Sequence, residues 1–465
     1  MRVAEGEFLN PEHSTLNESP SIARNLAPVY DGGCEGKSFV HPACRPYMTQ
    51  LSSVPPSPLP DPEEEVYGRV FWLQYLANTS LVLANALTFR FAELVNFLGG
   101  TERIAGDIVA VGLAVAVIVR LSAAHVIDDF GTRRMWILST LLYLIGCGLL
   151  ISARHLGWEI YVGRIAYVVG LTSMFACSMT NIQHHVPAHR RTEVIDNLGS
   201  SGFIGMILGS NLADAFIRFL PPGHIQFVAL FGTAAVVGVA YLWMVVTLTH
   251  GDKPLREHPS SPAFLLLFRH WPGMVVLVSM IMGLGVTVTT VFLTRYATHR
   301  GIEGLGWFFS AYAVSAFAFR ILARKWGHTI GRHWMLVRGL LGHTIGHAML
   351  PFVTQDWQFI LPAVICGFGH ALLFPAVVSL GSGAFPLQSR GAGTAIILGF
   401  TDFGSLVFSP ILGRIIVDAG FQAMFLTSAA TGLVGALIYL PIALRYRDEE
   451  THSTVPVAPL AFDTE

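Results

Sequence analysis

The sequence predicts an all-α integral membrane protein with twelve transmembrane helices in two pseudo-symmetric six-helix bundles. Three observations predict this class. Of the 465 residues, 52% are hydrophobic and only 13% are charged, and the mean hydropathy is +0.55. Apolar stretches recur along the chain with charges gathered between them, and the two halves repeat each other. A soluble protein does not carry so much apolar surface, so the solvent around this chain is lipid.

The apolar stretches match the length that a bilayer requires. A hydrocarbon core about 30 Å thick needs roughly 20 apolar residues per helix. Twelve windows of this length begin near Val70, Ala105, Trp136, Ile160, Val194, Ile225, Pro272, Leu305, Trp334, Phe359, Gly391 and Met424. The polar stretch at 249–270 divides them into two groups of six. We therefore expect bundles at 68–249 and 271–447, joined by a cytoplasmic linker at 250–270.

The two ends of the chain have a different composition. Residues 1–67 contain a proline-rich run followed by Glu63, Glu64 and Glu65, and such a segment cannot bury enough apolar surface to fold alone. We expect a disordered tail at 1–67 and a second tail at 448–465, and we see no cleavable signal peptide. The five cysteines form no CxxC pair, so neither a disulfide framework nor a zinc site is predicted.

Basic residues predict the orientation, because Lys and Arg in short loops resist translocation. One set of alternate loops holds eleven of them: Arg133, Arg134, Arg190, Arg191, Lys253, Arg256, Arg269, Arg324, Lys325, Arg332 and Arg390. The other set holds five: Arg103, Arg154, Arg218, Arg295 and Arg300. We therefore expect a multi-pass protein of the cell (inner) membrane with both termini in the cytoplasm.

Several partners and activities are not expected. The net charge of -1 gives no reason for a nucleic-acid partner. The chain lacks the GxxxxGK[ST] phosphate-binding loop, and we find no converging nucleophile and base. We expect no enzymatic activity, no cofactor and no metal site, and a monomer in the bilayer whose partners are a small-molecule substrate and protons.

An internal repeat relates the halves of the membrane domain. Arg120 and Gly131 recur as Arg320 and Gly331, an offset of 200 residues. Four residues around the fifth span recur around the eleventh at an offset of 199: Pro187, Arg191, Gly205 and Ser210 match Pro386, Arg390, Gly404 and Ser409. Two regions that agree within one residue predict two parallel six-helix repeats, as in several transporter folds.

Residues 124–134, after the second span, read AHVIDDFGTRR. This segment resembles the signature of the major facilitator superfamily of secondary transporters: Gly, three residues, Asp, a basic residue, any residue, Gly and then basic residues. Asp128, Gly131 and Arg133 keep their places, whereas the first glycine and two of the basic residues are replaced. The resemblance covers about residues 69–446 and implies the two-bundle fold of that superfamily.

The resemblance also implies a gate. In the family, the carboxylate at Asp128 closes the cytoplasmic side against the N-terminus of helix 11, where free amides favour negative charge; here that end is Arg390 and Gly391. A solvated loop carboxylate is the alternative. Arg120 and Arg320 lie near the cytoplasmic helix ends, where they either snorkel or pair within the gate.

Two charged residues inside spans are candidates for proton coupling. Asp402 lies about 16 Å along helix 11, near the middle of the hydrocarbon core, so it should be protonated or paired. Arg164 lies about five residues into helix 4 and is similar to an arginine that family members associate with proton coupling. A structural tie to a neighbouring helix is the alternative for Asp402.

Polar residues inside helices 1, 9 and 10 leave two readings open. Gln74, Asn78 and Asn85 share one helical face, and they either line a cavity or bond neighbouring helices. His370 in helix 10 either titrates or is a core histidine with a satisfied hydrogen bond. His343 and His347 have metal-ligand spacing without further ligands in sequence, so we expect packing there.

These observations predict a secondary active transporter of a small organic solute that works by alternating access. By its similarity to bacterial efflux permeases, we expect proton coupling and efflux. Two alternatives remain: a transporter-like sensor that binds its ligand without moving it, and a proton-coupled importer of a metabolite.

The basic-residue count generates a test of topology. Cysteines introduced at Gly157 and Gly301 should react with an impermeant reagent added outside the cell, because their loops belong to the set poor in Lys and Arg. A cysteine introduced at Ser260 should react only after permeabilisation. Labelling of Ser260 alone in intact cells would overturn the predicted orientation.

Overall fold

The structure is a computed structural model, and it describes residues 67–186, 190–251, 263–302, 304–323, 326–386 and 389–452. The chain divides into two units, Met1–Glu64 and Glu65–Glu465, and every described residue belongs to the second. The predicted tails at 1–67 and 448–465 therefore lie mostly outside the described residues.

The described residues contain the twelve predicted membrane-crossing helices. The first six are α2 (Arg69–Leu87) with its continuation α3 (Phe91–Phe97), α4 (Glu102–Phe130), α5 (Thr132–Ser152), α6 (Trp158–His185), α7 (Arg191–Phe219) and α8 (His224–Leu248). The second six are α10 (Val275–Thr287) with its continuation α11 (Leu293–His299), α12 (Gly306–Leu322), α14 (Arg332–Met349), α15 (Ile360–Gly383) and the two segments of α16 (Arg390–His452). Short helices α9 (Ala263–Arg269) and α13 (Trp326–Thr329) lie between them.

The long helix α16 contains the last two spans. Gly420 has φ +84°, outside the helical region, and separates a segment at 390–419 from one at 421–452. In the described part of the chain, eight helices are long and apolar enough to cross a membrane, and the longest of these holds both spans of α16. The start of every helix falls within four residues of its predicted window, so the predicted fold class is confirmed.

The first membrane-crossing helix (α2 and α3, helix 1) and the seventh (α10 and α11, helix 7) are interrupted at positions that the 200-residue offset relates. A 3-10 turn, η2 (Thr88–Arg90), links α2 to α3, and a π-helical segment, η4 (Val288–Phe292), links α10 to α11. Threonine hydroxyls within both segments donate to backbone carbonyls: Thr88 to Asn85 at 2.7 Å and Thr290 to Val286 at 2.8 Å. Such side-chain bonds compete with the helical ladder, and π segments in helices are frequent at functional sites.

The repeat is visible in backbone conformation. Gly131 has φ +82° and ψ +143°, and Gly331 has φ +86° and ψ +143°. Each begins the next helix directly, and each has a backbone conformation that L side chains rarely adopt. The two predicted repeat glycines therefore make the same turn in both halves.

The same symmetry governs contacts between helices. A Cβ at Gly205 would collide with the carbonyl oxygen of Thr79, and a Cβ at Gly404 would collide with that of Met280. These contacts join α2 to α7 and α10 to α16, the same pair of helices in each bundle. Small residues let the backbones approach closely, as is common between membrane helices.

Hydrogen bonds join these same helix pairs. In the first bundle, the Asn78 amide nitrogen donates to Ser201 Oγ at 2.6 Å. In the second bundle, Ser279 Oγ donates to the Ile397 carbonyl at 2.7 Å and lies 2.9 Å from Thr401 Oγ1. Each bundle is thus held internally by close contacts and buried polar bonds.

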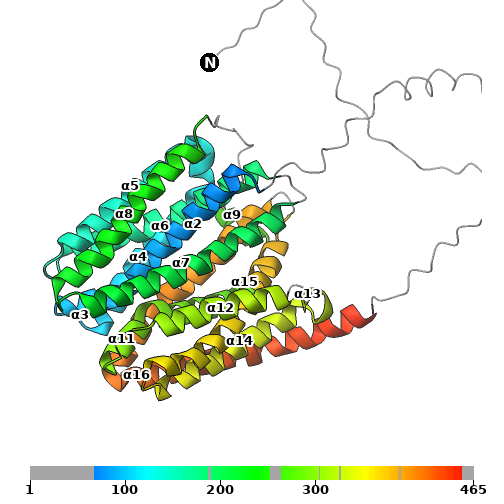
Figure 1. Cartoon of the computed structure of the whole chain (residues 1–465). Helices are drawn as coiled ribbons and strands as arrows, with labels where there is room; N and C mark the ends of the chain where they lie inside the picture. The colour runs from blue at the N-terminus through cyan, green and yellow to red at the C-terminus, as the bar shows by residue number, and fades with distance from the viewer. Residues whose placement is uncertain are drawn as a thin grey trace, which may run out of the picture. The chain divides into compact units, whose positions relative to one another are not determined.

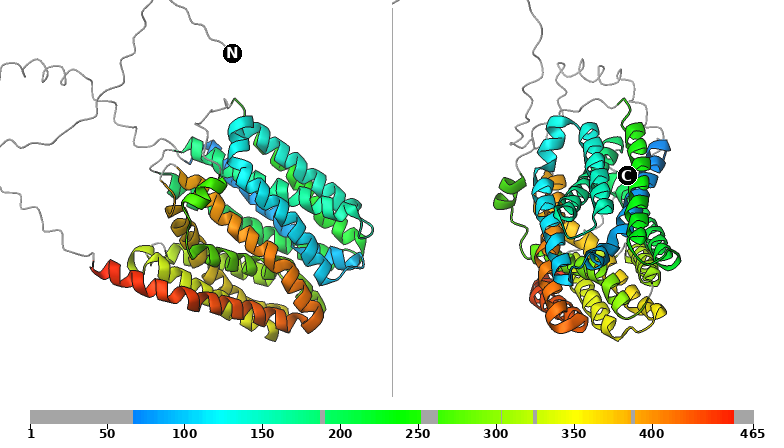
Figure 2. Two further views of the ribbon diagram at one scale, coloured as in Figure 1. Left: turned by 180° about the vertical axis from the view of Figure 1, so that it is seen from behind. Right: turned by 90° about the vertical axis from the view of Figure 1, so that its left-hand side faces the viewer.

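The bundles lie side by side and meet along two seams, α4 against α16 and α7 against α12. Figure 1 shows them close together where α3 and α11 lie, and further apart towards the end where α9 and α13 lie. Figure 2 shows that the start of α2 and the end of α16 lie towards this second end. We call the two ends the α3 end and the α9 end.

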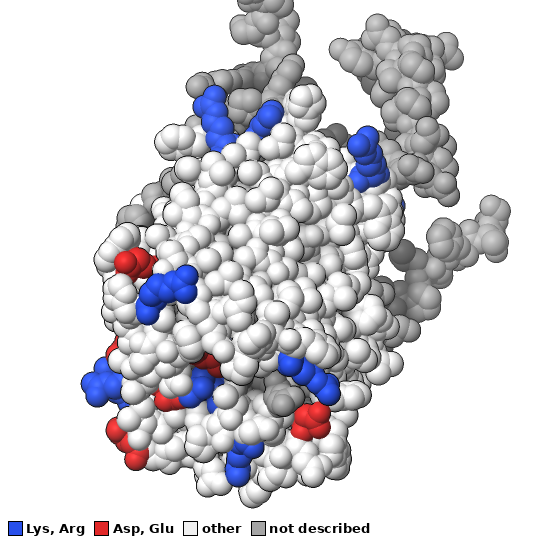
Figure 3. Space-filling view, turned by 60° about the vertical axis from the view of Figure 1, so that its left-hand side comes forward, with Lys and Arg blue, Asp and Glu red and all other residues white. Residues whose placement is uncertain are grey.

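The surface is that of a protein in lipid. Large apolar side chains are exposed on many helices, among them Trp72, Ile118, Trp243 and Leu437. On the face in Figure 3, basic groups alone occupy the top, groups of both signs gather towards the bottom, and mostly uncharged surface lies between. This pattern fits an apolar band between two aqueous ends.

The close contacts generate a prediction about stability. Gly404→Ala should destabilise the protein by about 1–3 kcal/mol, because the methyl group has no room beside Met280. Gly148→Ala on α5 is the matched control, since a Cβ there meets nothing within 4 Å. Thermal unfolding in detergent should show a lower midpoint for Gly404→Ala and an unchanged or higher one for Gly148→Ala.

Candidate functional site

A cavity of about 180 Å³ lies between the bundles. The first bundle contributes residues of α2, η2, α3, α4 and α6, and the second contributes residues of α10, η4 and α16. Its polar lining residues are Asn85, Thr88, Arg164, Tyr167, Thr172, Thr287, Thr290, Asp402 and Ser405. The two interrupted helices therefore meet at one cavity, which both halves of the protein form.

Asp402 forms an ion pair across the seam between the bundles. Its Oδ2 atom lies 2.8 Å from both Nε and Nη2 of Arg120, which projects from α4. The exposed fractions of the two side chains are 11% for Arg120 and 21% for Asp402. The sequence predicted that Asp402 is protonated or paired, and the structure contains a pair with Arg120 rather than with Arg164.

In the first half of the chain, the position equivalent to Asp402 holds a different residue. The 200-residue offset relates Arg120 to Arg320, and the 199-residue offset relates Asp402 to Phe203. Arg320 lies over the Phe203 ring, with Cζ 5.9 Å from the ring centre, and over Phe374 at 5.5 Å. The scaffold therefore repeats an arginine at the seam, and an aromatic ring occupies the position in the first half that Asp402 occupies in the second.

Arg164 lies on the opposite wall of the cavity, on α6. Its guanidinium carbon is 4.6 Å from the centre of the Phe91 ring and 5.6 Å from that of Tyr167. Its Nε atom is buried and has no hydrogen-bond partner among the described residues. Aromatic faces attract a desolvated cation, and the unpaired nitrogen remains available to a ligand in the cavity.

A chain of hydroxyl and amide groups continues along this wall. The Tyr167 hydroxyl donates to Asn85 Oδ1 at 3.1 Å and lies 2.8 Å from Thr88 Oγ1. Asn85, the third residue of the predicted polar face, thus lines the cavity. These groups can both donate and accept hydrogen bonds.

The other two residues of that face bond neighbouring helices. The Gln74 amide nitrogen donates to Ser178 Oγ at 2.6 Å and to the Ser178 carbonyl at 3.0 Å on α6, and Gln74 is fully buried. Asn78 is buried and bonds Ser201. In this conformation both side chains bond neighbouring helices, which is the second of the two interpretations that the sequence left open.

Arg320 borders a second cavity, of about 310 Å³, formed by α7, α12, α14 and α15. His370 on α15 packs between aromatic rings, 5.7 Å from Tyr312 and 5.6 Å from Phe374. Neither side chain lines the central cavity.

The predicted gate lies at the α9 end. Gly131 and Arg133 begin α5, and Arg390 and Gly391 begin α16. Arg390 and Gly391 are exposed. The side chain of Asp128 lies outside the described residues, so its contact with α16 stays a prediction.

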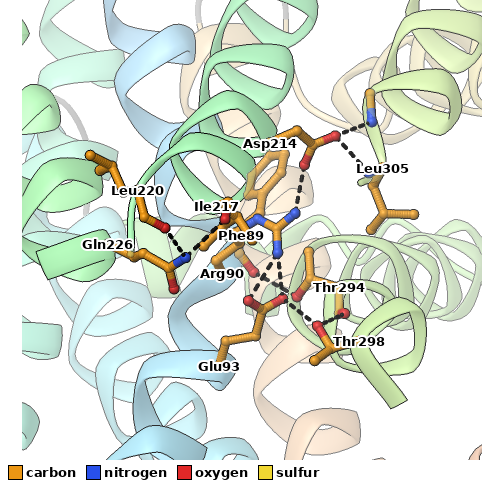
Figure 4. A network of polar contacts seen from close by, with 11 residues as sticks. Phe89, Arg90, Glu93, Asp214, Ile217, Leu220, Gln226, Thr294, Thr298 and Leu305 are labelled. Atoms are coloured by element: carbon orange, nitrogen blue, oxygen red, sulfur yellow. Dashed lines mark hydrogen bonds and ion pairs between the residues drawn. The ribbon is translucent and has the colours of Figure 1, made fainter. Parts of the chain in front are cut away.

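A charged cluster closes the seam at the α3 end (Figure 4). Arg90 Nη1 donates to both carboxylate oxygens of Glu93 at 2.9 Å, and Arg90 Nη2 donates to Asp214 Oδ1 at 2.6 Å. The second oxygen of Asp214 accepts the backbone N–H groups of Leu305 and Gly306, at 2.7 and 2.5 Å. Asp214 on α7 therefore caps the N-terminus of α12 in the other bundle, where a carboxylate is favourable.

Further polar contacts cross the seam beside this cluster. Arg295 Nη2 on α11 lies 2.8 Å from Glu102 Oε1 on α4, and the Asn211 amide donates to Ser310 Oγ at 2.9 Å. A cavity of about 680 Å³ reaches Asp214 from this side. Neither Asp214 nor Glu102 was predicted as a site residue from the sequence. The feature that could have indicated them is a carboxylate near the end of an otherwise apolar window.

Known proteins share the sequence pattern over most of the chain. The family model described as Major Facilitator Superfamily matches residues 70–305 and 275–461. The uncharacterized MFS-type transporter YhhS of Escherichia coli is 25% identical over 245 residues, which are 53% of this chain and 58% of that protein. The YhhS protein of Salmonella enteritidis is 26% identical over 48% of this chain and 54% of its own length. The chain thus matches little more than half of the length of these relatives.

Solved structures share the fold. The nucleoside transporter NupG, as a D323A mutant, superposes with a TM-score of 0.67 at 14% identity, over 80% of this chain and 99% of that one. A D-xylose-proton symporter gives 0.64 at 16% identity, over 80% and 96%. With the family model matched across both bundles, the chain belongs to the Major Facilitator Superfamily.

Proposed function

We propose that this protein is a proton-coupled secondary transporter of a small organic solute, with Asp402 as the proton-binding carboxylate. One observation carries the proposal: Asp402 lines the cavity between the bundles and also pairs with Arg120 across the seam. A single group is therefore in contact with both the solute space and the other bundle.

The pair supplies a physical link between proton binding and movement. A neutral Asp402 no longer compensates the Arg120 charge, and removing one partner of a buried pair costs about 3–5 kcal/mol. Protonation therefore favours a conformation in which the seam opens and Arg120 reaches water. Loss of the proton restores the pair and draws α4 and α16 together.

The two ends of the seam have opposite roles in this proposal. The Arg90–Asp214 cluster closes the α3 end, and the bundles separate towards the α9 end. The described starts of α5, α14 and α16, which carry basic residues of the larger set, lie at the α9 end, and we assign this end to the cytoplasm with both termini. The conformation described is then closed outside, and the gate predicted at Asp128 and Gly391 would close the inside in the alternate state.

The cavity lining indicates the kind of solute. Hydroxyl and amide groups from Asn85, Thr88 and Thr290 face it together with Arg164, and the phenylalanines Phe89 and Phe91 supply apolar walls. At about 180 Å³ the cavity lies below the roughly 300–1,000 Å³ typical of drug-sized ligands. This supports a small solute with hydrogen-bonding groups. Efflux is the proposed direction because the sequence resembles efflux permeases.

Asp402→Asn tests the coupling. The variant keeps the side chain's size but cannot bind or release a proton. Exchange of solute down its own gradient should therefore continue, while accumulation of solute against a gradient is lost. The assay is transport into and out of proteoliposomes of defined protein orientation, under an imposed pH gradient, with a library of small organic solutes. The side on which solute accumulates reports direction.

Asp418→Asn is the control, because Asp418 is an exposed carboxylate on the same helix. It should behave as the unchanged protein. The double variant Arg120→Gln/Asp402→Asn removes both charges of the pair and should remain folded yet uncoupled. Full proton-driven accumulation by this double variant would assign the pair a purely structural role.

Asp214→Ala tests the gate at the α3 end. Loss of the carboxylate removes the contact to Arg90 and the cap on α12 together, so a cysteine introduced at Ser310 should label faster from that end. Asp107→Ala is the control, since Asp107 lies 4.0 Å from Arg414 and its side chain is 42% exposed. Equal labelling rates in the two variants would contradict a gating role for Asp214.

A further inference from the structure

Three potential metal ligands lie together inside the second bundle, away from the central cavity. His343 and His347 belong to α14, and Cys366 belongs to α15. One ligand atom of each lies within 4.8 Å of the others. Their exposed fractions are 7%, 2% and 0%. The sequence showed only the histidine pair; packing of α14 against α15 brings the cysteine to it.

Three ring nitrogens of the two buried histidines have no hydrogen-bond partner among the described residues. Among the described residues, neither ring nitrogen of His343 has a hydrogen-bond partner, and Nε2 of His347 has none. Buried polar atoms are almost always hydrogen-bonded, and each exception requires a physical reason. A bound ion would satisfy these nitrogens together with the Cys366 sulfur.

Ser428 is placed to orient the ring of His347 through a hydrogen bond. His347 Nδ1 lies 2.9 Å from Ser428 Oγ, which projects from the second segment of α16. Histidines that bind metals nearly always use their second ring nitrogen for such a hydrogen bond, which sets the ring's orientation. The bond leaves Nε2 of His347 as the ligand atom, and this is the nitrogen without a partner.

Two glycines leave space for the side chains of His343 and Cys366. A Cβ at Gly285 on α10 would lie 2.9 Å from His343 Nδ1, and a Cβ at Gly346 would collide with Cys366 Sγ. Three ligands at 2.0–2.3 Å from one metal stand about 3.5–4 Å apart in a trigonal array. Small shifts of side chains within the 4.8 Å limit therefore complete the site.

We propose that His343, His347 and Cys366 bind one Cu(I) ion. Thiolate ligands select soft ions such as Cu(I) and Zn(II). Zn(II) prefers four ligands, whereas this cluster provides three. One thiolate and two neutral imidazoles around Cu(I) carry no net charge, while the same ligands around Zn(II) leave a buried positive charge that is costly in a membrane domain. Binding transfers the Cys366 thiol proton to solvent, with no change in oxidation state.

The bound ion would join α14 to α15, and Ser428 would connect it to α16. None of the three ligands lines the central cavity, so the site is separate from the proposed proton pathway. It would act as a crosslink within the second bundle, and the midpoint of thermal unfolding should rise when the ion is added.

The experiment uses the full chain, purified in detergent and stripped with a chelator. Titration with Cu(I) under anaerobic, reducing conditions, in competition with a chromophoric Cu(I) chelator, should give one ion per chain. X-ray absorption of the complex should show one sulfur and two nitrogen neighbours. A parallel titration with Zn(II) should give weaker binding.

The variants separate ligands from bystanders. Cys366→Ser and His343→Asn should abolish binding, and Ser428→Ala should weaken it by about 10–100-fold, as the loss of an orienting hydrogen bond does elsewhere. Cys177→Ser, which removes a buried cysteine of α6, should bind as the unchanged protein does. Size-exclusion profiles establish folding, and His347→Gln replaces any ligand variant that does not fold.

The proposal would be overturned by less than one Cu(I) per chain at saturation, by full binding to Cys366→Ser, or by tighter binding of Zn(II) than of Cu(I). A complex without a sulfur neighbour would do so as well, because it would place the ion away from Cys366.

Discussion

A charge inside a lipid-embedded bundle is stable only if a partner or water compensates it, and this constraint organises the functional part of the molecule. Three of the described ion pairs lie where the two bundles meet: Arg120 with Asp402, Arg90 with Asp214, and Arg295 with Glu102. Within each bundle, by contrast, glycines and neutral polar groups hold the helices together. Each bundle is therefore held together by close glycine contacts and neutral polar bonds, while the contact between the bundles also contains charged groups.

The repeat builds a symmetric scaffold, and single residues make it asymmetric. The turns at Gly131 and Gly331 and the close contacts at Gly205 and Gly404 are equivalent in the two halves. The arginines are equivalent too, but Asp402 faces one of them and an aromatic ring faces the other. A carboxylate changes charge on binding a proton and a phenyl ring does not, so the two halves differ chemically at this position. The interrupted helices 1 and 7 add backbone irregularity at the same cavity, where it is tolerated because it is enclosed by protein.

Polar contacts join the two bundles at two places along their length. At the α3 end, Asp214 satisfies two backbone N–H groups of α12 as well as Arg90, so this closure combines a helix cap with an ion pair. About two thirds of the way along α4, Arg120 pairs with Asp402, and among the described ion pairs this is the one with a member that lines the central cavity. The first contact joins the bundles at the α7–α12 seam and the second joins them at the α4–α16 seam.

The sequence by itself determined the twelve helices, their duplication and the family, because hydropathy, glycine turns and a signature such as Asp128–Gly131–Arg133 are local properties that each half carries twice or in one short segment. It also indicated that Asp402 needs compensation, because depth in a span follows from counting residues. Only the tertiary structure decided which partner compensates it, since Arg120 is 282 residues away in sequence and Arg164 was an equally charged candidate. Packing likewise placed Asp214 on the start of α12, turned Gln74 and Asn78 towards neighbouring helices, and brought Cys366 to the histidines of α14. These pairings depend on which helices touch and on the rotation of each about its axis, and the hydropathy of a span constrains neither.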